Sequence, residues 1–84
     1  MIDCYITFRS ITRAQKGSRL LESAGIHHQM LRTPKIIADQ GCGYALRVRR
    51  DTARMAVEAL RQNEIVYQRV YSGAENGPYE EIQL

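Results

Sequence analysis

The run Gly41-Cys42-Gly43 contains the most conspicuous chemical group of this sequence, a cysteine thiol between two glycines. Glycines remove the Cβ atoms that would shield the sulfur, and they allow positive φ angles that turn successive backbone N–H groups toward an anion. Lys35 and Arg47 lie nearby in the sequence, and nearby cations lower the pKa of a thiol. The pattern predicts a nucleophilic thiolate at Cys42. The alternative is an inert thiol in a tight turn.

Other groups with chemical potential are few. Cys4 alternates with Ile6 and Phe8, which is typical of a small core residue on a strand. We expect Cys4 to lie far from the Cys42 loop and to form no intramolecular disulfide with it. His27 and His28 are adjacent on a strand and point in opposite directions, so a hydrolytic triad with Cys42 is not supported. The cysteines and histidines lack the paired spacing of metal ligands, so we expect no metal site and no bound cofactor.

Four strands and two helices are expected to position these groups. Alternating or β-rich segments predict strands at residues 4–9, 26–31, 44–49 and 65–71. Apolar residues at helical spacing predict one helix that begins at Ser10 or Thr12 and ends at Gly25, and a second between Asp51 and Asn63. This order predicts the α+β class: a ferredoxin-like β-α-β-β-α-β sandwich. Its four-stranded antiparallel sheet would have the order 4-1-3-2, with two helices on one face.

The domain organisation is expected to be simple. We expect one ferredoxin-like domain over residues 1–71, followed by a C-terminal tail over 72–84. The turn signal Asn76-Gly77-Pro78 would leave residues 79–84 as a short edge strand or as a segment that packs on a partner. No apolar run approaches the roughly 20 residues of a membrane span, and the first residues lack a signal-peptide pattern, so we expect a cytoplasmic protein.

This topology predicts where the thiol lies. The loop between the second and third strands belongs to the same end of the sheet as the start of the first helix, near Ser10. The positive end of that helix could then face the Cys42 thiolate.

The sheet face away from the helices is expected to be solvated or to form an interface. It would carry Tyr5, Thr7, Arg9, Arg47 and Arg49. The net charge is +3; all 12 Lys and Arg residues precede residue 70, whereas Glu75, Glu80 and Glu81 follow it. A basic domain suits an anionic partner, so RNA stacked on Tyr5 and Tyr67 is one alternative, and a homodimer through this face is another.

The sequence also resembles a known family. Three segments carry the resemblance: Tyr5-Ile6-Thr7-Phe8-Arg9-Ser10, Thr33-Pro34-Lys35 and Gly41-Cys42-Gly43-Tyr44-Ala45-Leu46-Arg47. Together they resemble the small bacterial selenium/sulfur carrier-like family over roughly residues 4 to 71. The resemblance implies a protein that accepts sulfur or selenium as a persulfide or perselenide from a donor protein and passes it to an acceptor.

These observations lead to two hypotheses about function. In the first, the chain is a cytoplasmic thiol carrier, rather than a hydrolase, with Cys42 as the carrier residue. Gly41 and Gly43 would shape its loop, Pro34 would stiffen it, Lys35 or Arg47 would stabilise the anion, and Ser10 would begin the facing helix. In the second, the chain is a non-catalytic binding or assembly module that contacts a second copy or RNA through the open sheet face, and Cys42 is incidental.

Overall fold

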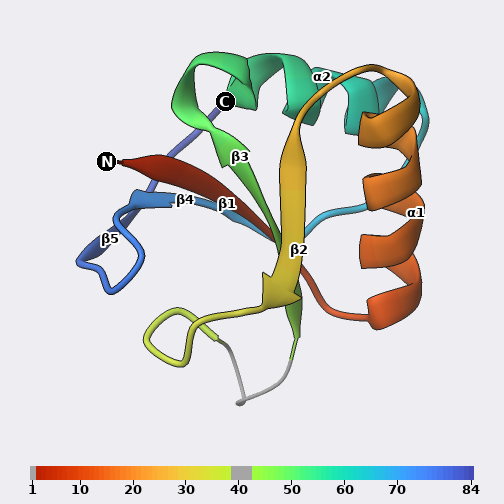
Figure 1. The fold of residues 1–84 in the computed structure, drawn as a ribbon. Helices are drawn as coiled ribbons and strands as arrows, with labels where there is room; N and C mark the ends of the chain where they lie inside the picture. Colours follow the sequence, from red (N-terminus) through yellow and green to blue (C-terminus); the bar gives the residue numbers. More distant parts are fainter. Residues whose placement is uncertain (1, 39–42) are drawn as a thin grey trace.

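The computed structural model describes residues 2–38 and 43–84 of the chain. The described residues form two helices and five strands (Figure 1): β1 (Asp3–Phe8), α1 (Ile11–Ser23), β2 (His28–Arg32), β3 (Tyr44–Arg49), α2 (Ala53–Gln62), β4 (Val70–Gly73) and β5 (Tyr79–Glu81). Within the described residues, no helix is long and apolar enough to cross a membrane.

The strands form one sheet in the order β2-β3-β1-β4-β5, and every neighbouring pair is antiparallel. The α+β class and the predicted order of the first four strands are confirmed. The prediction of a four-stranded sheet is wrong, because the chain turns back after β4 and residues 79–81 pair with it as a fifth strand.

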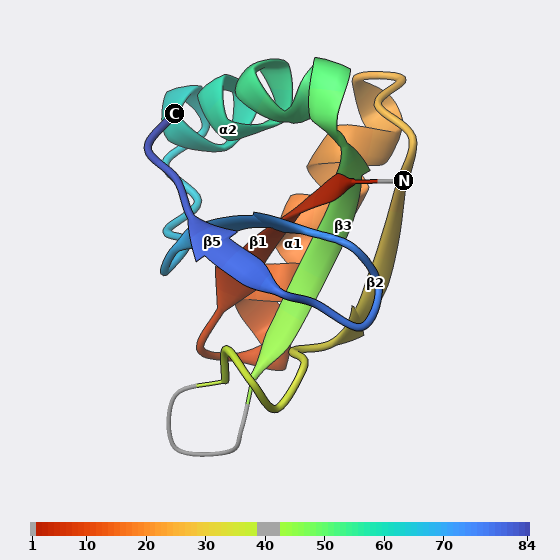
Figure 2. The same ribbon diagram turned by 90° about the vertical axis from the view of Figure 1, so that its left-hand side faces the viewer.

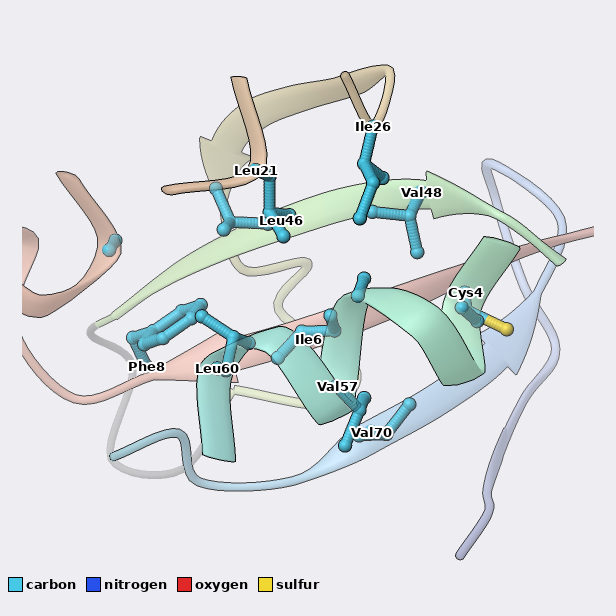
Figure 3. Close-up of a cluster of buried hydrophobic side chains, with 13 residues drawn as sticks. Cys4, Ile6, Phe8, Leu21, Ile26, Leu46, Val48, Val57, Leu60 and Val70 are labelled. Atoms are coloured by element: carbon cyan, nitrogen blue, oxygen red, sulfur yellow. The ribbon is translucent and has the colours of Figure 1, made fainter. Parts of the chain in front are cut away.

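The core lies between the sheet and both helices. Alternation along β1 directs Cys4, Ile6 and Phe8 toward the helices, as the sequence pattern predicts. Figure 3 shows these side chains with residues from both helices and from β3 and β4. The helical stripes bury Ala14, Gly17 and Leu21 from α1, and Ala53, Ala56, Val57 and Leu60 from α2. Leu20 and Ala24, which the apolar spacing also places on the inner side of the first helix, are only partly buried and exposed, respectively. Burial of these two amphipathic stripes therefore holds both helices on one face of the sheet.

The face of β1 that points away from the helices is buried, whereas the sequence predicts it to be open to solvent or to a partner. Tyr5 is 1% exposed, and Asp3 and Thr7 are also buried. Figure 2 views this face and shows the β4–β5 hairpin crossing in front of β1. The Tyr79 ring packs edge-on against Tyr5, with 5.3 Å between the ring centroids. The C-terminal hairpin therefore covers part of the face that sequence reasoning left open.

β4 begins at Val70, later than predicted. At Arg69, hydrogen bonds to the Thr7 side chain take the place of part of the regular backbone pairing between the strands. The Thr7 hydroxyl donates to the Arg69 carbonyl (3.2 Å) and accepts from the Arg69 N–H (3.1 Å). A threonine hydroxyl can compete in this way with backbone pairing. Gln68 and Arg69 form backbone hydrogen bonds with Thr7 of β1 without being part of β4.

The start of α2 also differs from the prediction. Residues Arg50–Thr52 form a 3-10 turn, and Thr52 takes the N-cap position. Its hydroxyl makes no capping hydrogen bond to α2 and donates instead to the Arg49 carbonyl (3.2 Å). Asp51 instead lies 3.6 Å from Arg49, as an exposed ion pair. Asp51 is thus not the predicted cap. The other predicted helix boundaries are confirmed: Ser10 caps α1 by accepting from the Arg13 N–H, and Asn63 ends α2.

Candidate functional site

The loop between β2 and β3 begins and ends at the end of the sheet where α1 starts (Figure 1). Its two described ends are joined by a hydrogen bond from the Thr33 N–H to the Gly43 carbonyl (3.1 Å). Beyond Thr33 the chain makes a tight turn, in which the Ile37 N–H donates to the Pro34 carbonyl (3.0 Å). Pro34 is partly buried in this turn and Lys35 is exposed. These two hydrogen bonds define the base of the loop at this end of the sheet.

The backbone at position 43, at the base of the loop, requires a residue without a side chain. Its φ is +138°, and a Cβ there would lie 3.0 Å from the Phe8 carbonyl oxygen and 3.4 Å from Thr33 Oγ1. Residues with a Cβ rarely adopt such a φ, and glycine does so without strain. The glycine after Cys42 in the sequence therefore allows the chain to enter β3 directly against β1.

Cys42 and Gly41, the predicted carrier residue and its neighbour, lie outside the described residues. The structure places the other predicted residues in two groups. The first group lies at the end of the sheet where α1 begins and consists of Ser10, Pro34, Lys35 and Gly43. Arg47 lies three residues into β3 from Tyr44, roughly 10 Å along the strand.

Arg47 is bound to an acid on the covered face of the sheet. Its Nε donates to Asp3 Oδ2 at 2.8 Å, and the Asp3 side chain is 10% exposed. This hydrogen bond is the main reason that the pKa of Arg47 is raised above its ordinary value. The sequence predicts Arg47 at the sulfur site. It does not indicate Asp3 as the partner of Arg47, because the residue directly opposite Asp3 on β3 is Arg49.

Cys4 is a core residue, as predicted. Its exposed fraction is 1%, and it packs in the apolar cluster between sheet and helices. Burial raises the pKa of the Cys4 thiol, and the charge of Arg50 offsets this only in part. A thiol that is buried and protonated is a poor nucleophile. The environment of Cys4 is therefore that of a core residue and disfavours thiolate chemistry.

Tyr5 cannot stack on a base as the RNA hypothesis requires. Its ring is buried beneath Tyr79, and its hydroxyl has no hydrogen-bond partner among the described residues. Burial raises the pKa of this phenol above its ordinary value, although the Arg47 charge opposes the effect. Tyr67, the other predicted stacking residue, is held by a hydrogen bond from Arg61 Nη2 to its hydroxyl (2.8 Å).

His28 links β2 to α1. Its Nδ1 lies 3.0 Å from the Ile26 carbonyl, which can only accept, so we assign the proton to Nδ1. Nε2 then accepts from the Ser18 hydroxyl at 2.6 Å. Within the described residues, no group of three or more His, Cys, Asp or Glu side chains is arranged to hold a metal ion. His28 therefore ties β2 to α1, whereas His27 is exposed.

Sequence reasoning missed the Thr33 hydroxyl. Its Oγ1 is buried and has no hydrogen-bond partner among the described residues, and it faces the position that a Gly43 side chain would occupy. A buried hydroxyl without a partner costs about 1–3 kcal/mol. Because Thr33 precedes Pro34, the sequence indicated only the end of a strand here.

Comparison with protein families gives one match. The family described as "Putative Se/S carrier protein-like" matches residues 3–72, which include all of β1 to α2 and the connection to β4. The family resemblance in the sequence is thereby confirmed. No curated protein and no solved structure matches the chain.

Proposed function

Because this chain belongs to the "Putative Se/S carrier protein-like" family, we propose that it carries sulfur or selenium on the thiol of Cys42. One observation supports this assignment above the others. The chain has two cysteines, and Cys4 is buried in the core with a raised pKa. Burial of Cys4 supports Cys42 as the carrier residue.

The base of the loop supports the same proposal. Gly43, the residue after Cys42, adds no side-chain atoms to the base of the loop. The Thr33 hydroxyl at this base has no hydrogen-bond acceptor among the described residues. A persulfide anion would supply that acceptor. Lys35 is exposed in the adjoining turn and adds a positive charge to this end of the molecule.

The proposed reaction is thiol–persulfide exchange in two balanced steps. The Cys42 thiolate attacks the outer sulfur of a donor persulfide, so the donor S–S bond breaks and the donor leaves as a thiolate, while Cys42 becomes a persulfide. An acceptor thiolate then attacks the outer sulfur and releases the Cys42 thiolate. Selenium would follow the same steps as a perselenide. No external oxidant or reductant is consumed.

Loading from a low-molecular-weight persulfide tests this proposal. We expect mass spectrometry of the wild-type protein to show one added sulfur on the peptide that contains Cys42. Cys42→Ala should abolish the adduct, and Cys4→Ala should retain it, because Cys4 is protected by burial. An adduct that persists in Cys42→Ala, or that maps to Cys4, would refute the assignment.

A further inference from the structure

A cleft of about 260 Å³ lies between the start of α1 and the segment that precedes β4. It is lined by Arg9, Arg13, Val66, Tyr67 and Gln68. This volume is slightly below the range of pockets for drug-sized ligands, so it suits one or two side chains of a partner.

The cleft carries unneutralised positive charge. Arg9 and Arg13 are exposed, and neither guanidinium makes a hydrogen bond or ion pair in the described part of the chain. Among the described residues, the lining contains no acidic side chain, and the first turn of α1 has none either. Both cations line the same cleft, so a bound anion would be attracted by each of them.

The cleft also has an apolar side. Val66 is 60% exposed, and the neighbouring Tyr67 is held in place by Arg61. Two further apolar residues are exposed, Ile11 at the start of α1 and Ile36 in the turn after β2. The start of α1 and this turn lie at the same end of the molecule (Figure 1). Apolar side chains beside arginines are typical of the centre of a protein interface.

The cleft adjoins the base of the Cys42 loop. A Cβ on Gly43 would lie 3.0 Å from the Phe8 carbonyl, and Arg9 is the next residue along the chain. A protein that approaches this end of the sheet to exchange sulfur would therefore also cover Arg9 and Arg13.

We infer that the cleft is the docking site for an acidic segment of the protein partner in sulfur exchange. Arg9 and Arg13 bind an Asp or Glu carboxylate of the segment, and Val66 contacts a neighbouring apolar side chain. Charge complementarity favours this occupant. RNA is disfavoured because Tyr5 is buried and the Tyr67 hydroxyl is already bonded to Arg61. The inference rests on the proposed function, since it names the chemistry of the partner.

The test is an NMR titration of the ¹⁵N-labelled full chain with an amide-capped peptide of alternating Glu and Leu. We expect amide shifts at Arg9, Arg13, Val66 and Tyr67, and an affinity that falls with added salt. The double substitution Arg9→Gln with Arg13→Gln should weaken binding about fivefold to tenfold. Arg54→Gln, which removes an exposed arginine of α2, serves as the matched control and should change the affinity by less than about twofold.

Three outcomes would overturn the inference. The first is equal binding of a peptide in which Gln replaces Glu. The second is a set of shifts that maps to the separate cleft beside Asp3, Arg47 and Arg49. The third is an RNA oligonucleotide that shifts the cleft amides when the peptide does not. Sulfur loading from a small persulfide should survive the double substitution. A wild-type chain that binds the peptide but loads no sulfur would refute the proposed function and leave the docking site standing.

Discussion

Gly43→Ala is expected to lower the free energy of unfolding by about 2–3 kcal/mol and to slow sulfur loading of Cys42. The backbone φ of +138° costs a residue with a Cβ about 1–3 kcal/mol. The new Cβ would also meet the Phe8 carbonyl at 3.0 Å, and this carbonyl belongs to the central strand and cannot move freely. Thermal unfolding should shift down by roughly 10 to 20 °C.

Gly25→Ala is the matched control for this prediction. Gly25 also has a positive φ, +75°, but a Cβ there would meet nothing within 4 Å. The substitution should cost about 1 kcal/mol, the usual penalty of a left-handed residue, and should leave loading unchanged. If Gly43→Ala were no more harmful than Gly25→Ala, or if it loaded sulfur at the wild-type rate, the role given to Gly43 would be wrong.

Gly73→Ala is expected to displace the C-terminal hairpin and to destabilise the fold by about 2 kcal/mol. A Cβ at Gly73 would lie 2.6 Å from the Pro78 carbonyl oxygen and 2.7 Å from Tyr79 Cδ1, which is too close for any real contact. The hairpin must therefore move, and the edge-on contact of Tyr79 with Tyr5 is lost. Such aromatic contacts contribute about 0.5–1.5 kcal/mol beyond the area they bury.

The titration of Tyr5 measures this displacement directly. Burial raises the pKa of Tyr5 above its ordinary value of 10.0, so the folded state binds the phenol proton more tightly than the unfolded state does. The wild-type fold should therefore lose stability as the pH rises through the ordinary pKa. In Gly73→Ala, the Tyr5 pKa, followed by ring ¹³C shifts, should fall toward 10 and this loss should shrink. Ser72→Ala, which changes the preceding residue of β4, should alter neither quantity.

The sequence was sufficient for those features that depend on local pattern. Alternation in β3 and the apolar stripes of α1 and α2 predicted their faces, and the position of Cys4 between core residues predicted its burial. The right-handed crossover of each β-α-β unit predicted that the loop after β2 would meet the start of α1.

The remaining features depend on contacts between distant segments. Tyr5 alternates like a solvent-facing residue, and its burial comes from Tyr79 in the fifth strand. The later start of β4 depends on the hydrogen bond between the Thr7 hydroxyl and Arg69. The cleft at Arg9 and Arg13 is completed by residues 66–68, which are more than 50 positions away in the sequence. No periodicity reports such pairings, so the covered face and the docking cleft could not be predicted.

The most direct test of the carrier function is a chase of the bound sulfur. The protein would be loaded with isotopically labelled sulfur from a persulfide donor, freed of the donor by gel filtration, and mixed with an excess of an acceptor thiol. We expect the label to leave the Cys42 peptide and to appear on the acceptor as a persulfide, at matching rates and with the Cys42 thiol restored. Label that stays on Cys42, or that is released as free sulfide without labelling the acceptor, would refute the carrier function and would identify Cys42 as a reactive thiol only.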